Sequence, residues 1–140
     1  MDKEIRPSGL NLLGGISQGQ GRILLVDDED IQVRTMTAML ERLGFQVVGK
    51  TDAREALREF RRLPEDFDLV ITDQNMPRLT GEKLAGKILR LRPDMPIILC
   101  TGYSEQMNEE TAKAKGIRAF VMKPFSLLEI AGTIRRVLES

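Results

Sequence analysis

The residues best suited to chemistry in this chain are acids that follow apolar runs. Asp73 ends the run Leu69-Val70-Ile71-Thr72, and the helix-breaking Pro77 follows shortly after it. A buried parallel strand ends in this way when it delivers one carboxylate to the mouth of a sheet. A carboxylate held there can act as a nucleophile and form an acyl phosphate. We therefore predict that Asp73 accepts a phosphoryl group; the simpler alternative is an aspartate that begins a turn before Pro77.

A second acidic group, Asp27-Asp28-Glu29, follows the apolar run Ile23-Leu24-Leu25-Val26. Acids are common at the start of a helix because the helix dipole favours negative charge there, so capping is one interpretation of this group. One acid is enough for a cap. Two consecutive acids together with Asp73 instead favour a site for a hard cation such as Mg²⁺, which binds oxygen ligands and shares phosphate oxygens.

Two further polar residues, Thr101 and Lys123, also end apolar segments. Taken singly, Thr101 could cap the next loop and Lys123 could be a surface lysine. If the apolar segments are parallel strands, their carboxyl ends share one edge of the sheet, where ligands bind in such folds. Thr101 and Lys123 then lie on the same edge as the acids, and this convergence is the strongest argument from the residues alone.

Apolar strand-like segments alternate with amphipathic segments along most of the chain. Strands are predicted at residues 22–26, 45–49, 68–72, 96–101 and 118–122. Helices, from apolar spacing and from capping or stop signals, are predicted at residues 30–43, 53–60, 81–92, 104–115 and 126–138. Five strand–helix units predict an α/β fold with a doubly wound five-stranded parallel sheet in the flavodoxin-like order 2-1-3-4-5. In that order the sheet reverses between the first and third strands, which carry Asp27, Asp28 and Asp73.

The first 21 residues differ from the rest of the chain. They are rich in glycine, serine and glutamine, so we predict that residues 1–21 are a flexible linker or tail and that residues 22–140 form one domain. No apolar run is long enough for a signal peptide or a membrane span. The single cysteine, Cys100, fits a reducing compartment. We therefore expect a cytoplasmic location.

The 140 residues carry no formal net charge and include no histidine. Zero net charge gives no general electrostatic reason to expect a nucleic acid or an anionic membrane as partner. The lack of histidine removes Ser-His-Asp and Cys-His catalysis and the usual zinc sites. A phosphoryl group that comes from a histidine must therefore come from a residue outside this sequence.

Taken together, these motifs resemble the receiver domain of bacterial two-component response regulators. The resemblance extends from about Arg22 to the C-terminus and rests on Asp27-Asp28, Asp73-x-Asn75-Met76-Pro77, Thr101-Gly102 and Lys123-Pro124-Phe125. It implies the flavodoxin-like (αβ)5 receiver fold. It also implies that Asp73 takes its phosphoryl group from a phosphohistidine of a histidine kinase or a histidine phosphotransfer domain. The domain would then be a phosphoprotein switch in a two-component phosphorelay that assists its own phosphorylation and dephosphorylation.

The resemblance also assigns the metal site. It implies that Asp28, Asp73 and the backbone carbonyl of Asn75 hold Mg²⁺, with Asp27 assisting through water. Lys123 would pair with the phosphoryl oxygens. This division of labour is chemically coherent, because in-line phosphoryl transfer depends on positioning and charge neutralisation more than on covalent help.

A switching role follows from the same resemblance. Thr101 would move to hydrogen-bond the phosphoryl group, and Phe120, at the switch-aromatic position, would turn inward with it. The surface made by the fourth strand, the fourth helix and the fifth strand would then favour a second arrangement. The bond between Lys123 and Pro124 resembles the family's cis peptide.

The run Cys100-Thr101-Gly102-Tyr103-Ser104 resembles the receivers of hybrid histidine kinases. The C-terminal receiver of such a kinase is the favoured context, in which case the full-length protein would be a histidine kinase. A stand-alone single-domain regulator is the alternative. Tyr103 is a bulky residue near the pocket, which could change the phosphoryl lifetime in either direction. The sequence is compatible with a homodimer and does not identify an output partner.

Two competing functions deserve comparison. A Mg²⁺-dependent phosphatase of the haloacid-dehalogenase type needs Asp-x-Asp at its nucleophile, whereas the residue two after Asp73 is Asn75. A receiver-like interaction module that takes no phosphate would be expected to lack Asp73, Lys123 or the acidic pair. All of these are present, so the phosphoacceptor switch is preferred.

Overall fold

One parallel sheet with strand order β2-β1-β3-β4-β5 forms the centre of the computed structural model, which describes residues 21–102 and 109–139. This order and the α/β class confirm the prediction from the sequence. The strands of the described chain are β1 (Arg22–Val26), β2 (Gln46–Lys50), β3 (Leu69–Asp73), β4 (Ile97–Thr101) and β5 (Ala119–Met122). The helices are α1 (Asp30–Arg42), α2 (Ala53–Arg62), α3 (Gly81–Leu91), α4 (Glu109–Ala114) and α5 (Leu127–Glu139), with the short 3-10 helix η3 (Pro64–Asp66) after α2.

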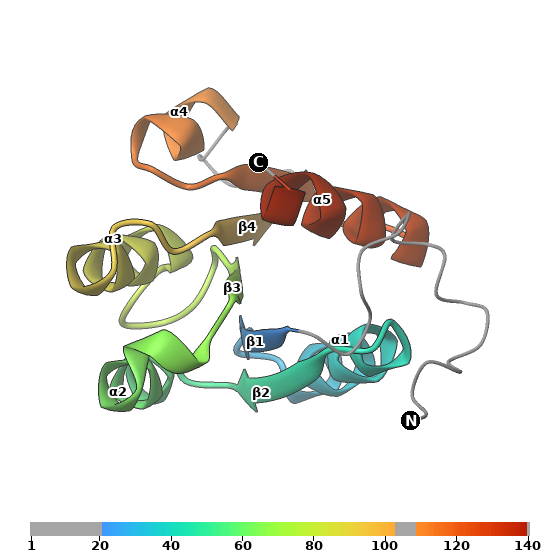
Figure 1. Cartoon of the computed structure of the whole chain (residues 1–140), viewed down its shortest axis with the longest axis horizontal. Helices are drawn as coiled ribbons and strands as arrows, with labels where there is room; N and C mark the ends of the chain where they lie inside the picture. The colour runs from blue at the N-terminus through green and yellow to red at the C-terminus, as the bar shows by residue number, and fades with distance from the viewer. Residues whose placement is uncertain (1–20, 103–108, 140) are drawn as a thin grey trace.

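Helices cover both faces of the sheet (Figure 1). Because side chains alternate along a strand, neighbouring residues of β1 point into different layers. Leu24 and Val26 belong to the layer under α2, α3 and α4, whereas Ile23 and Leu25 belong to the layer under α1 and α5. The central strands β1, β3 and β4 are therefore buried on both sides, as is usual in a parallel sheet, whereas the edge strands β2 and β5 are only partly buried.

Most element boundaries differ from the sequence prediction by about one residue. The third strand includes Asp73 itself and begins at Leu69, while the second runs from Gln46 to Lys50. These ends are set by ladder hydrogen bonds to neighbouring strands, which the pattern of a single segment does not contain. In α5 the predicted capping box is present in full: the Ser126 backbone N–H donates to Glu129 Oε1, 2.7 Å, and the Glu129 N–H donates to Ser126 Oγ, 3.1 Å.

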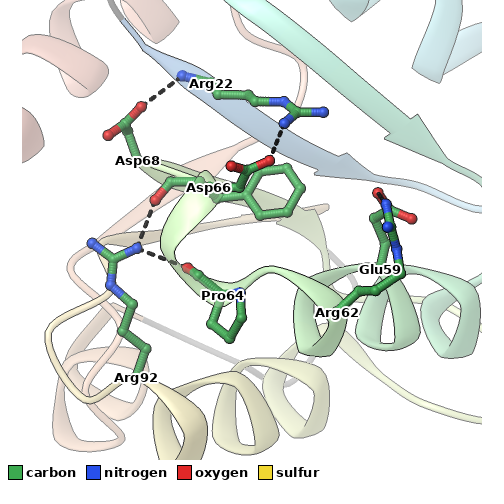
Figure 2. Close-up of polar contacts among 8 residues, drawn as sticks. Arg22, Glu59, Arg62, Pro64, Asp66, Asp68 and Arg92 are labelled. Atoms are coloured by element: carbon green, nitrogen blue, oxygen red, sulfur yellow. Dashed lines mark hydrogen bonds and ion pairs between the residues drawn. The ribbon is translucent and has the colours of Figure 1, made fainter.

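The connection between α2 and β3 is held by polar contacts at the amino-terminal edge of the sheet (Figure 2). Arg92, just after α3, donates through Nη1 to the carbonyls of Pro64, 2.9 Å, and Phe67, 2.7 Å. Arg22, at the start of β1, pairs with Asp66, and its backbone N–H donates to Asp68 Oδ2, 2.8 Å. Arg22 of β1 and Arg92, just after α3, therefore hold the segment that leads into β3.

Some predictions lie outside the described residues. These are the flexible character of residues 1–20, the first part of the helix predicted at 104–115, and any effect of Tyr103. Within the described part of the chain, no helix combines the length and the apolar character needed to cross a bilayer.

Candidate functional site

Three aspartates meet at the carboxyl edge of the sheet because two neighbouring parallel strands end there. Val26 of β1 lies opposite Thr72 of β3, so the residues that follow each of them emerge side by side. One carboxylate oxygen from each of Asp27, Asp28 and Asp73 lies within 4.8 Å of the others. Asp27 and Asp73 are buried, whereas Asp28 is exposed. The structure therefore brings together the three acids that the sequence singled out.

Lys123 supplies the counter-charge for this cluster. Its Nζ lies 2.7 Å from Asp73 Oδ1 and 3.4 Å from Asp27 Oδ2. Burial is the largest single influence on the pKa of Lys123 and acts to lower it, but the hydrogen bonds and charges of Asp73 and Asp27 together raise that pKa above its ordinary value. Lys123 is thus held as a cation against the carboxylate predicted to be the nucleophile. The peptide bond between Lys123 and Pro124 is cis.

The donor atoms at this edge fit a hard divalent cation. They are carboxylate oxygens of unequal burial, a combination that suits Mg²⁺, which binds oxygen and retains water. The backbone carbonyl of Asn75, the fourth ligand that the resemblance implies, accepts no hydrogen bond from any residue that the structure describes, and Asn75 is exposed. Burial raises the pKa of the nearby Cys100 thiol to about 12, so this thiol is protonated at neutral pH and the carboxylates are the charged donors of the site.

Thr101 and Phe120 lie near this edge on neighbouring strands, and the Thr101 carbonyl accepts a hydrogen bond from the Lys123 backbone N–H at 2.8 Å. Thr101 ends β4, the strand next to β3, and is fully buried; its Oγ1 donates to the Gly102 carbonyl at 3.3 Å. Phe120 of β5 is half-buried and packs on the layer that contains α2, α3 and α4. The two residues therefore occupy neighbouring strands on the side of the sheet that carries α4.

The connection between β3 and α3 contributes two residues that sequence reasoning did not single out for the site. The backbone carbonyl of Gln74 accepts from the Gly81 N–H, 3.0 Å, and its side-chain Oε1 accepts from the Glu82 N–H, 2.8 Å. Gly81 was recognised as the first residue of a helix. Its closeness to Asp73 was not, because no spacing in the sequence reports how near two segments approach.

The sequence also did not predict a small cavity lined by two of the acids. Its walls include Asp27, Asp73 and Lys123 from the site, with Gln32 and Met36 of α1 and the ring of Phe125. Both Gln32 and Met36 lie within the helix predicted at residues 30–43, but that prediction did not connect them with the acids. Both residues line this cavity together with the charged groups.

Chemically, the arrangement offers a buried carboxylate paired with a fixed cation, beside two acids able to share a divalent metal. Such a carboxylate can attack an electrophilic phosphorus, while the surrounding cations neutralise the charge on the phosphoryl oxygens. The Cys100 thiol lies beside this site, but burial raises its pKa to about 12, so it offers no thiolate nucleophile at neutral pH.

The chain is similar in sequence to a family of known proteins. The family model described as the response regulator receiver domain matches residues 23–135. The chain is 36% identical over 117 residues to the probable transcriptional regulator ycf27 of Porphyridium aerugineum, covering 84% of this chain and 48% of that protein. It is 31% identical over 121 residues to the sensor kinase CckA of Brucella abortus, covering 86% of this chain and 13% of the kinase. The chain thus spans about half or less of these relatives.

Solved structures of receiver domains resemble this chain over most of its length. The crystal structure of a response regulator receiver domain protein from Clostridium thermocellum superposes with a TM-score of 0.81 at 28% identity, covering 85% of this chain and 94% of that one. A CheY-like receiver domain protein from Methanospirillum hungatei superposes with a TM-score of 0.78 at 31% identity, covering 88% of this chain and 95% of that one. Both likenesses extend over almost the whole of the solved chains.

Proposed function

The chain belongs to the response regulator receiver family, and from this premise we propose that Asp73 accepts a phosphoryl group in a two-component phosphorelay. One observation carries the proposal: Lys123 Nζ lies 2.7 Å from Asp73 Oδ1, with oxygens of Asp27 and Asp28 within 4.8 Å of an Asp73 oxygen. A carboxylate paired in this way, at the edge of the sheet where ligands enter, is positioned to be a nucleophile.

In the proposed reaction, an Asp73 carboxylate oxygen attacks the phosphorus of a phosphohistidine on a partner chain. The new oxygen–phosphorus bond forms as the phosphorus–nitrogen bond breaks, and the imidazole leaves with the electron pair of that bond. Lys123 exchanges part of its contact with Asp73 for the incoming phosphoryl oxygens, since an ammonium carries three donors. Attack and departure occur in line, so holding Asp73 rigid lowers the barrier.

Mg²⁺ would be held by Asp28, Asp73 and the carbonyl oxygen of Asn75, with Asp27 acting through water. When bound, the ion would neutralise charge that develops on the phosphoryl oxygens. In its absence the carboxylates repel one another and rely on Lys123 alone among the charges described here. We therefore expect added Mg²⁺ to stabilise the folded domain as well as to permit phosphorylation.

The phosphoryl group would act as a switch through Thr101 and Phe120. Thr101 would turn toward the new phosphoryl oxygens, and Phe120 would fill the space that its movement vacates. The surface formed by β4, α4 and β5 would be the readout. Support for this role comes from the position of both residues on adjacent strands, Thr101 at the end that faces the site.

We further propose that the donor is a histidine kinase or a histidine phosphotransfer domain and that the domain works in the cytoplasm. Residues 1–21 would be a linker or tail and residues 22–140 the receiver. A C-terminal receiver of a hybrid histidine kinase is the favoured context, and the similarity to part of the sensor kinase CckA supports it. The similarity to the ycf27 regulators keeps a separate response regulator as the alternative.

Intact-protein mass spectrometry after incubation with acetyl phosphate and Mg²⁺ tests the acceptor. Wild type should gain one phosphoryl group, Asp73→Asn none, and Asp28→Asn much less. Asp94→Asn, an exposed carboxylate before β4 at the opposite edge, is the matched control and should behave as wild type. A gain that survives in Asp73→Asn would identify a different nucleophile. If folded wild type gains no phosphoryl group from acetyl phosphate or from a phosphorylated histidine kinase, the alternative of a receiver-like interaction module that is not phosphorylated would be favoured.

A further inference from the structure

Gln74 makes more hydrogen bonds than any other residue of the β3–α3 connection in the described structure. Its backbone N–H donates to the Cys100 carbonyl of β4, 2.9 Å. Its backbone carbonyl accepts from the N–H groups of Met76, 3.1 Å, and Gly81, 3.0 Å. Its side-chain Oε1 accepts from the Glu82 N–H, 2.8 Å. The residue is therefore fixed to the sheet on one side and to α3 on the other.

The bond from Glu82 is a helix cap supplied from outside the helix. The first N–H groups of a helix have no intrahelical partner, and a residue just before the helix usually provides one. Thr80 does so here, because its Oγ1 accepts from the Lys83 N–H at 3.3 Å. Gln74, eight residues before Glu82, adds a second and shorter cap. The segment from Asn75 to Leu79 is thereby closed into a loop whose ends are both held by Gln74.

The geometry of Gln74 also determines where the Asn75 carbonyl points. The carbonyl of Asn75 and the N–H of Met76 belong to one planar trans peptide group, in which they point in opposite directions. The Met76 N–H is directed at the Gln74 carbonyl oxygen. The Asn75 carbonyl must therefore point away from that oxygen, and no described residue donates to it.

We propose that the Gln74 side chain is a positioning residue for this carbonyl: by capping α3 from the loop, it holds the peptide group that presents the Asn75 oxygen to the metal. The inference rests on the proposed function, since it takes the Asn75 carbonyl as a ligand. The Gln74 side chain accepts from the Glu82 N–H and is therefore assigned a positioning role, not the role of a metal ligand. Gln74 would act through its side-chain hydrogen bond with the Glu82 N–H and through the hydrogen bonds of its own backbone.

Magnesium affinity, measured by isothermal titration calorimetry, tests the role apart from phosphorylation. Gln74→Met keeps the size of the side chain and removes the acceptor, so binding of Mg²⁺ should weaken by about tenfold, as expected for loss of a group that orients a ligand. Hydrogen exchange at the Glu82 amide should accelerate in the same variant. Gln74→Glu keeps the acceptor and should restore both values, compared at high salt so that its added charge is screened.

Thr80→Ala is the matched control, because it removes the local cap of α3 and leaves the loop closed. It should lower the melting temperature without weakening Mg²⁺ binding. Wild-type affinity in Gln74→Met, or an equal loss in Gln74→Met and Thr80→Ala, would overturn the positioning role while leaving phosphorylation of wild type intact. A wild type that neither binds Mg²⁺ nor takes a phosphoryl group would instead refute the proposed function, and this inference with it.

Discussion

Gly81 lies so close to Asp73 that no side chain fits between them. A Cβ on Gly81 would stand 2.1 Å from the Asp73 carbonyl oxygen and 2.8 Å from Leu99 Cδ1. The first residue of α3 is therefore packed directly on the end of the strand that carries the proposed acceptor. Any change that lifts α3 from this strand must also move the loop between them.

Gly81→Ala should lower the free energy of unfolding by about 3 kcal/mol, because the main clash is with backbone, which cannot rotate away. Gly86→Ala is the matched control within the same helix. A Cβ there would meet nothing within 4 Å, so alanine should stabilise the helix by about 0.5–1 kcal/mol. Urea unfolding of the two variants measures both effects, and a similar change in the two would contradict the close contact at Gly81.

The strand ends explain why most of the site could be predicted from the sequence. Asp27 and Asp73 each follow an apolar run, and the alternation of strands and helices is enough to predict a parallel sheet. In such a sheet the carboxyl ends of neighbouring strands share an edge, so the acids and Lys123 had to lie near one another. Lys123 follows β5, and β4 separates β5 from β3, so its contacts with Asp73 and Asp27 depend on the reach of a long side chain as well as on the strand order.

The contacts of Gln74 and Gly81 could not be predicted in the same way. Both depend on how α3 settles on β3, which is decided by packing between segments and leaves no periodic trace in the sequence. The one-residue shift that includes Asp73 in β3 has a different cause, namely its pairing with Cys100 of the neighbouring strand β4. Gln32 was missed because an exposed polar residue on an amphipathic helix looks like solvent-facing surface until the neighbouring strand ends are in place.

The raised pKa of Lys123 predicts a loss of stability at alkaline pH. A base whose pKa is higher in the folded state stabilises the fold fully below its unfolded pKa, and that contribution disappears as pH rises through the folded value. For Lys123 the loss should therefore begin above about pH 10.5, its ordinary pKa. In Lys123→Met this part of the alkaline decline should be missing, so the difference between the two unfolding free energies should shrink above that pH.

Lys83→Met is the control for this titration, since Lys83 is an exposed lysine of α3. It should keep the alkaline decline of wild type. The unfolding free energies of wild type and both variants can be compared by denaturant unfolding at pH values from 7 upward, about half a pH unit apart. A constant difference between wild type and Lys123→Met across the alkaline range would contradict the coupling of Lys123 to Asp27 and Asp73.

Arg78 occupies a backbone conformation that suits glycine better. Its φ of 68° lies in the left-handed region, which costs a residue with a Cβ about 1–2 kcal/mol. Its ion pair with Asp52, 3.8 Å apart and largely exposed, offsets little of that cost. Arg78→Gly should therefore raise the free energy of unfolding by about 1 kcal/mol, part of the relief being cancelled by the greater freedom of glycine in the unfolded chain.

Arg78→Ala separates the two contributions, because it removes the ion pair and keeps the strained φ. Its unfolding free energy should lie within about 0.5 kcal/mol of wild type. Thermal and urea unfolding of the two variants in parallel provide the test. If alanine stabilised the domain as much as glycine, the gain would come from the lost side chain and not from the backbone.

Substitution of Arg92 should lower the free energy of unfolding more than substitution of any other residue in the polar network at the amino-terminal edge of the sheet (Figure 2). Its Nη1 donates to two backbone carbonyls, and its Nε donates to Asp94 Oδ1 at 3.3 Å, while only 20% of the side chain is exposed. Arg92→Ala leaves the Pro64 and Phe67 carbonyls without this donor. Unfolding free energy should fall by about 2 kcal/mol, as for hydrogen bonds to a charged group.

Two further variants identify the cause of that fall. Arg92→Lys keeps the charge but lacks the planar fork that reaches carbonyls and carboxylate together, so it should recover only part of the loss. Arg62→Ala removes the exposed pair of Arg62 with Glu59 in the same region, 3.0 Å apart within α2, and should change stability little. If Arg92→Lys matched wild type, charge alone would account for the effect. If Arg62→Ala cost as much as Arg92→Ala, the bridging role of Arg92 between α3 and the segment before β3 would be wrong.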